Sequence, residues 1–219
     1  MFFIFDWDGT LSDSTATIVL AMQRAAEDIG WQRPEAEVVR NIIGLGLPEA
    51  IERIYPGINT ASSAALRDAY REHYTLIDQA DPAQLYPKVL DTLHQLRQQG
   101  HILAVATGKS RRGLDRVLKA LELETFFHAS RCADETASKP DPLMLDQLMA
   151  EVAMGPEVSV MIGDTEYDME MGRRAGMDRI AVSYGAHIRD RLIPYEPALC
   201  MDCFSQLLSW KRLANPLEK

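Results

Sequence analysis

Short apolar runs alternate with helical patterns over most of the chain. These runs occupy residues 2–5, 101–106, 158–162 and 179–182. Each is short enough to be a buried strand. Between them, apolar residues recur at helical spacing and the patterns end near glycines, as residues 89–96 do before Gly100. The alternation predicts an α/β protein whose parallel sheet is covered by helices on both faces.

Residues 14–85 interrupt this alternation because they contain helical patterns only. Apolar residues follow one side of a predicted helix at 15–29, and a second long helix is predicted at 62–77. We therefore predict an all-α cap domain at residues 14–85. It is inserted into a core domain formed by residues 1–13 and 86–219.

Polar residues follow three of the predicted strands. Asp6 and Asp8 come directly after the first strand, and Thr107 ends the second. Asp164 and Asp168 follow the run at 158–162. The carboxyl ends of parallel strands share one edge of a sheet, where ligands bind. Converging carboxylates repel one another unless a cation lies between them, and oxygen ligands without His or Cys favour Mg²⁺.

Lys139 is the candidate cation of the protein itself at this edge. It stands in the segment SKPDP, before a helical pattern, and prolines restrain the loop around it. Taken alone, a lysine in a loop is usually solvated, and an Asp-Gly-Thr segment is usually a turn. Their occurrence in order, at the ends of successive strands, favours a shared site.

Four segments together resemble the motifs of the haloacid dehalogenase superfamily. The segment DWDGTL, which begins at Asp6, resembles the D-x-D-G-T signature, and Thr107 resembles the second motif. Lys139 resembles the third motif, and GDTEYD at 163–168 resembles the fourth. The helical insert resembles the cap of the phosphoglycolate-phosphatase-like branch. The resemblance implies a Rossmann-like parallel sheet core with an inserted helical cap domain, and phosphatase chemistry.

The resemblance also implies catalytic roles. Asp6 is the expected nucleophile, which forms an aspartyl-phosphate. Asp8 is the expected general acid and base, oriented by Thr10. Thr107 and Lys139 are expected to bind the phosphoryl oxygens.

Further ligands are implied in the same way. The backbone amides of Trp7 and Gly108 are expected to assist in binding phosphate. The expected Mg²⁺ ligands are the carboxylates of Asp6 and Asp164 and the backbone carbonyl of Asp8, with Asp168 acting directly or through a water molecule.

The cap is expected to select the substrate. Gly44 lies in a glycine-containing loop between helices, at the position where related caps reach into the active site; a plain interhelical turn explains the loop equally well. Of the cap arginines, Arg24 and Arg40 are the candidates for holding an anionic substrate.

Three functions fit these residues. The first is hydrolysis of a small phosphate monoester, such as phosphoglycolate or a sugar phosphate. The second is a sugar phosphomutase, although residues 14–85 lack the lysine that such caps use. The third is a non-catalytic binding module on the same fold. Dehalogenases and phosphonatases of the superfamily lack the second aspartate, which is present here as Asp8.

Composition narrows the classes of partner. The chain is 47% hydrophobic and 25% charged, which is typical of a globular protein, and its net charge of -9 argues against a nucleic-acid partner. The expected partner is a small phosphorylated metabolite. No apolar run approaches the ~18 residues of a membrane span, so a cytoplasmic protein without a membrane partner is expected.

Cys200 and Cys203 form a C-x-x-C pair, which we interpret as free thiols because no second pair completes a zinc site. Monomer and homodimer both remain open.

Overall fold

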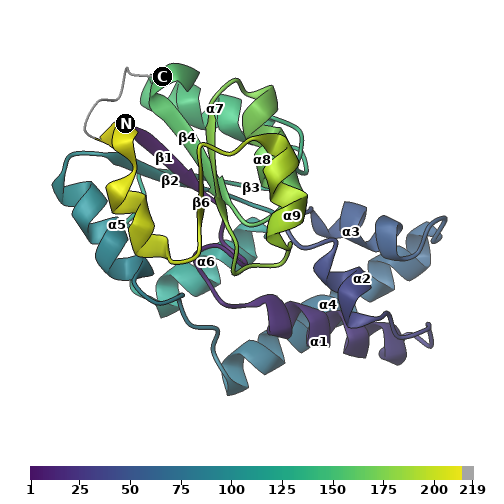
Figure 1. Cartoon of the computed structure of the whole chain (residues 1–219). Helices are drawn as coiled ribbons and strands as arrows, with labels where there is room; N and C mark the ends of the chain where they lie inside the picture. Colours follow the sequence, from purple (N-terminus) through teal and green to yellow (C-terminus); the bar gives the residue numbers. More distant parts are fainter. Residues whose placement is uncertain (214–219) are drawn as a thin grey trace.

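A computed structural model describes residues 1–213 of the chain and contains a six-stranded sheet with a helical cap beside it (Figure 1). The strands are β1 (Phe2–Phe5), β2 (Ile102–Thr107), β3 (Ala129–Cys132), β4 (Ser159–Gly163), β5 (Asp178–Val182) and β6 (Leu199–Met201). All neighbours are parallel, in the order β3-β2-β1-β4-β5-β6. The predicted α/β class and parallel sheet are confirmed.

Helices cover both faces of this sheet because its central strands are apolar on both sides. The α-helices of the core are α5 (Val89–Gln98), α6 (Arg111–Ala120), α7 (Leu143–Val152), α8 (Glu166–Arg174) and α9 (Arg189–Leu192). Short 3-10 helices are η1 (Pro156–Val158), η2 (Ile193–Tyr195), η3 (Phe204–Ser209) and η4 (Lys211–Leu213). Phe3 and Phe5 of β1 pack on the side of α5, α6 and η3, whereas Phe2 and Ile4 pack on the side of α7 and α8.

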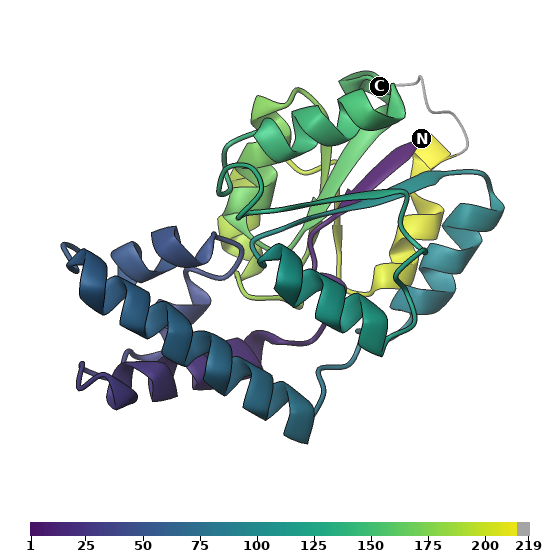
Figure 2. The same cartoon turned by 180° about the vertical axis from the view of Figure 1, so that it is seen from behind.

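The cap consists of helices only in the part of the chain between β1 and α5. These are α1 (Thr15–Asp28), α2 (Ala36–Arg40), α3 (Leu47–Ile54) and α4 (Thr60–Ala80). Helices α1 and α4 pack against each other along the side of the molecule away from the sheet (Figure 2). An antiparallel bridge pairs Ser12 with Leu85, so the two linkers between cap and core run side by side. Tyr167 of α8 packs into the apolar cluster of the cap and joins the two parts.

The three cysteines form no disulfide, and Cys132 is buried in the core. Within residues 1–213, no helix is long and apolar enough to cross a membrane.

Candidate functional site

The carboxyl ends of β1, β2 and β4 meet at the centre of the sheet. The chain runs outward from β1 to β2 and β3, and then returns to the other side of β1 with β4. Such a reversal leaves a crevice at the strand ends, where ligands bind in open α/β sheets. Asp6 follows β1 directly, and its amide donates to the Ile162 carbonyl of β4 at 2.9 Å.

Three carboxylates meet in this crevice. Asp6, Asp164 and Asp168 are buried, and each offers an oxygen that lies within 4.8 Å of the others. Lys139 is also buried, and its Nζ lies 2.7 Å from Asp6 Oδ1 and 2.7 Å from Asp168 Oδ1. The structure thus brings together four of the residues predicted from the sequence.

Local structure holds Asp168 in place. Thr165 is the N-cap of α8, and Asp168 is the third residue of that helix. The Thr165 amide donates to Asp168 Oδ2 at 3.0 Å, and its hydroxyl donates to the same oxygen at 2.7 Å. This capping box occupies Oδ2 and leaves Oδ1 facing Lys139. Asp168 therefore begins a helix and belongs to the cluster at the same time.

Asp164 is held from two sides. Thr10 Oγ1 donates to Asp164 Oδ1 at 2.9 Å, and the Ala186 amide donates to Oδ2 at 2.7 Å. Gly9 has a φ of 82°, and a Cβ there would lie 2.2 Å from Asp164 Oδ2. Glycine is required at this turn both for its backbone conformation and for space. Thr10 was predicted to orient Asp8; in the structure its hydroxyl binds Asp164 instead.

The electrostatics of the cluster favour a bound cation. Burial, and then the negative charge of Asp168, raise the pKa of Asp164 to about 7. Burial likewise raises the pKa of Asp6 well above its ordinary value, although Lys139 opposes this. Asp6 Oδ2 is buried and accepts no hydrogen bond from residues 1–213, and Oδ1 has only the ion pair with Lys139. A buried oxygen without a donor fits a metal ligand, and the all-oxygen donor set fits Mg²⁺.

A pH dependence of stability follows from Asp164. Its pKa rises from 3.8 to about 7 on folding, so the native state binds more protons between about pH 4 and pH 7. The unfolding free energy in chelator is therefore expected to fall with rising pH in this window, by about 1 kcal/mol per pH unit from this group. Asp164→Asn removes that slope. Denaturant titrations at several pH values should show the variant gaining on the wild type as pH rises; parallel curves would contradict the assignment.

Asp8 lies beside the cluster with partners of its own. Ser14 Oγ donates to Asp8 Oδ1 at 2.5 Å, and Lys109 Nζ lies 2.9 Å from the same oxygen. Ser14 precedes α1, but its hydroxyl does not cap that helix because it binds Asp8. Neither partner was predicted as a site residue. The signal for Lys109 was its place two residues after Thr107, which ends β2.

Two backbone amides next to the strand ends have no acceptor among the described residues. The N–H groups of Trp7 and Gly108 donate no hydrogen bond to any other described residue. Thr107 is fully buried at the end of β2, and its hydroxyl accepts from the Lys109 amide at 3.2 Å. Unpaired N–H groups near a lysine suit an anion.

The cap loop lies directly against this edge of the core. A Cβ on Gly108 would lie 2.5 Å from the Leu45 carbonyl oxygen and 2.6 Å from that of Gly44. The Gly46 amide donates to Ser138 Oγ at 2.8 Å. The predicted loop residue Gly44 is thus brought to the site, and the cap is closed over it.

A second contact of this loop joins cap and core farther out. The Asn41 carbonyl accepts from the Tyr167 hydroxyl at 2.7 Å and from His187 Nε2 at 3.3 Å. His187 Nδ1 accepts from the Glu166 amide at 3.2 Å, which assigns the proton to Nε2. Burial lowers the pKa of His187, and the neutral ring keeps both bonds.

The two predicted cap arginines do not join the cluster. Arg24 is exposed on α1, and Arg40 is exposed with its guanidinium 3.7 Å from Glu37. Neither contacts Asp6 or Asp8 in the part of the chain that the structure describes. Binding of substrate by these arginines stays a prediction.

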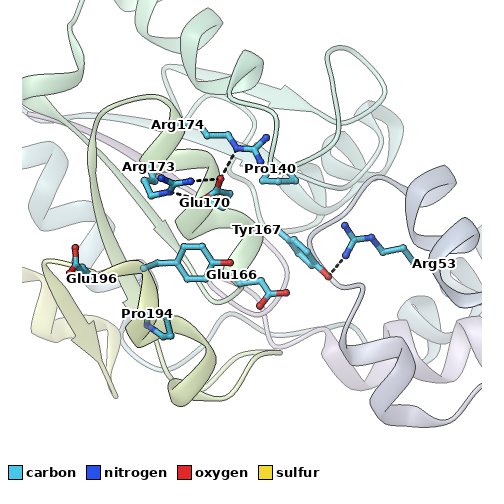
Figure 3. Close-up of a pocket in the computed structure, with 10 residues that line it drawn as sticks. Arg53, Pro140, Glu166, Tyr167, Glu170, Arg173, Arg174, Pro194 and Glu196 are labelled. Atoms are coloured by element: carbon cyan, nitrogen blue, oxygen red, sulfur yellow. Dashed lines mark hydrogen bonds and ion pairs between the residues drawn. The ribbon is translucent and has the colours of Figure 1, made fainter.

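A cavity of about 740 Å³ lies outside the cluster, where α3 of the cap faces α8 and η2 (Figure 3). Arg53 donates to the Tyr167 hydroxyl at 2.9 Å on one side of it. On the other side, Arg173 and Arg174 both bind Glu170 at 2.7 Å. None of the predicted site residues lines this cavity.

Comparison with known proteins agrees with the geometry. Residues 3–182 match the family of haloacid dehalogenase-like hydrolases. The chain is 35% identical to a Dickeya dadantii protein named "Probable phosphatase IndB", over 94% of this chain and 90% of that protein. It is 30% identical to a phosphoglycolate phosphatase of Vibrio cholerae, over 93% of both chains.

A solved structure supports the same conclusion. A haloacid dehalogenase-like family hydrolase from Streptococcus pneumoniae superimposes with a TM-score of 0.81 and 25% identity, covering 95% of this chain and 97% of that one. The predicted family and enzyme class are therefore confirmed. With its motifs gathered at one sheet edge, this chain belongs to the haloacid dehalogenase-like hydrolases.

Proposed function

We propose that this chain is a Mg²⁺-dependent phosphatase that hydrolyses a small phosphate monoester through a phosphoryl group on Asp6. The observation that carries this proposal is the buried carboxylate of Asp6. Its Oδ2 has no hydrogen-bond donor within residues 1–213, and Lys139 and two further carboxylates surround it. A structural aspartate would be satisfied by hydrogen bonds, whereas a nucleophile must have a free oxygen.

The proposed reaction has two steps. An oxygen of Asp6 attacks phosphorus, the bond from phosphorus to the ester oxygen breaks, and Asp8 gives its proton to the departing alcohol. A water then attacks the phosphoryl group, and Asp8 takes a proton from that water. The second step breaks the bond between Asp6 and phosphorus, and it restores both carboxyl groups.

The remaining residues bind and neutralise charge. Lys139 offsets the charge of Asp6, which otherwise repels the phosphate. The amides of Trp7 and Gly108, with Thr107, bind phosphoryl oxygens. Mg²⁺ would be held by Asp6, Asp164, Asp168 and the Asp8 carbonyl, and when bound it supplies positive charge toward the phosphoryl oxygens.

The proposed substrate is small because the cap loop lies against the core at Gly108. A phosphoglycolate-like compound or a sugar phosphate fits this, and a relative named as a phosphoglycolate phosphatase supports the first choice. No observation favours a phosphomutase: His73, the single cap histidine, binds Asp28 at 2.6 Å.

The test is phosphate release from a panel of esters with Mg²⁺ or with excess chelator. The panel contains phosphoglycolate, glycerol phosphate, glucose 6-phosphate, adenosine monophosphate, pyrophosphate and 4-nitrophenyl phosphate. Release that requires Mg²⁺ and strongly favours one ester in kcat/KM is expected. No release from any ester, or release that survives the chelator, would reject the proposal.

Gly108→Ala tests the closed cap. Its Cβ would meet two backbone oxygens of the cap loop, so the loop must move away from the core. We expect kcat/KM to fall by about 10²-fold because a displacement of about 1 Å in a site has that effect. The control is Gly113→Ala, whose Cβ would lie 3.3 Å from its nearest neighbour, Ser110 Oγ. Equal kcat/KM for the two variants would show that this contact does not matter.

A further inference from the structure

Lys109 connects Asp8 to the cap. It comes from the loop after β2, and its side chain is largely buried. Its Nζ lies 2.9 Å from Asp8 Oδ1 and donates to the Tyr74 hydroxyl of α4 at 3.1 Å. The ammonium also lies 4.6 Å from the centre of the Tyr74 ring. One lysine therefore touches the predicted acid of the core and an aromatic residue of the cap.

The two partners of Asp8 act on the same oxygen. Both Ser14 and Lys109 bind Oδ1, and Oδ2 accepts no hydrogen bond within residues 1–213. Two donors on one carboxylate oxygen fix the rotation of the side chain. The second oxygen is then available to a reacting atom.

Tyr74 is itself held by the core. The Arg116 guanidinium of α6 lies 5.3 Å from the Tyr74 ring centre. Arg116 also donates to Thr75 Oγ1 at 2.8 Å and lies 3.4 Å from Asp78, both on α4. The position of Tyr74 above Lys109 thus depends on α4 lying against the core.

We propose that Lys109 is a positioning residue for Asp8, and that Tyr74 makes this positioning depend on the cap. This inference rests on the proposed function, in which Asp8 protonates the departing alcohol. Lys109 holds Asp8 by Oδ1 so that Oδ2 points to the ester oxygen. When the cap moves away, Lys109 loses its contact with Tyr74, and Asp8 is held less firmly.

Esters with different leaving groups distinguish a residue that positions the acid from a residue that binds the phosphoryl group. An alkyl phosphate releases an alkoxide, which needs a proton, whereas 4-nitrophenolate leaves without one. A residue that positions the acid matters for the first ester and little for the second. A residue that binds the phosphoryl group matters equally for both. The appropriate quantity is kcat/KM, since it reports the steps up to departure of the alcohol.

The experiment compares Lys109→Met and Tyr74→Phe with the wild type on two esters. One is 4-nitrophenyl phosphate, and the other is the alkyl phosphate of the panel that the wild type hydrolyses best. For Lys109→Met we expect kcat/KM to fall by about tenfold or more for the alkyl ester and by less than about threefold for the aryl ester. Tyr74→Phe keeps the ring and should give a smaller fall with the same selectivity.

The controls are Lys119→Met, exposed on α6, and Tyr55→Phe, whose hydroxyl donates to the Gln32 carbonyl away from the site. Equal losses on both esters, or no loss, would overturn the inference. If Lys109→Met does not fold, the selectivity of Tyr74→Phe decides. A wild type without phosphatase activity would refute the proposed function, whereas an active wild type with unselective variants would refute only the role of Lys109.

Discussion

Asp6→Asn is expected to reduce phosphate release to the background of the assay while the protein stays folded. The amide cannot form the bond to phosphorus, so the reaction loses its nucleophile and not merely a contact. The unfolding free energy in chelator should not fall, because Lys139 keeps its ion pair with Asp168, and a neutral side chain avoids the cost of burial that raises the pKa of Asp6. Activity and denaturant titration on the same preparation measure both effects.

The matched control is Asp190→Asn, an exposed carboxylate at the first turn of α9. This substitution should change neither phosphate release nor the unfolding free energy. Phosphate release by Asp6→Asn at a rate comparable to that of the wild type would contradict the role of Asp6.

Lys139→Met is expected to lower both stability and activity. Lys139 is the cation between Asp6 and Asp168, and its removal leaves both buried carboxylates without their ion pair, with hydrogen bonds from Thr165 to Asp168 alone. Burial alone would lower the pKa of Lys139, but Asp168 and Asp6 outweigh it and raise that pKa. Breaking a buried ion pair in this way costs about 3–5 kcal/mol, and loss of one charge-stabilising group lowers the rate by roughly 10²–10³-fold.

Denaturant titration in chelator measures the loss of stability in Lys139→Met, and kcat/KM measures the loss of activity. Mg²⁺ should restore part of the stability, since it binds the folded carboxylates and replaces the missing charge. Lys119→Met is again the control. A loss of stability below about 1 kcal/mol, the range of an exposed pair, would show that the ion pair of Lys139 is not a buried one in solution.

The central strands could be predicted from the sequence, and the edge strands could not. Strands β1, β2 and β4 are apolar on both faces, because helices cover both sides of the sheet. Strand β3 lies at an edge, and Arg131 within it binds Gln147 and Glu151, so no apolar run marks it. Strand β6 has three residues, which is too short for a pattern.

The candidate site also has parts that the sequence predicts and parts that it does not. Asp6 and Asp164 directly follow strands, and Lys139 lies in the loop between β3 and α7, so their approach to one another follows from the topology of a parallel sheet. The contact of Lys109 with Tyr74 depends on where α4 carries Tyr74, which is 35 residues away from Lys109 along the chain. Such a contact depends on how the cap packs against the core, and the spacing of residues in the sequence does not predict it. The roles of all these residues stay predictions until they are measured.

The most direct test asks whether phosphorus becomes bonded to Asp6. Asp8→Asn with 4-nitrophenyl phosphate and Mg²⁺ should slow the second step, so that the phosphoryl-enzyme accumulates and a burst of nitrophenolate equals the enzyme concentration. Borohydride reduction at that moment converts an acyl phosphate to homoserine, which peptide mass spectrometry locates. The account predicts homoserine at position 6 alone. A nitrophenolate burst with an unmodified Asp6, or with the label on another residue, would contradict it.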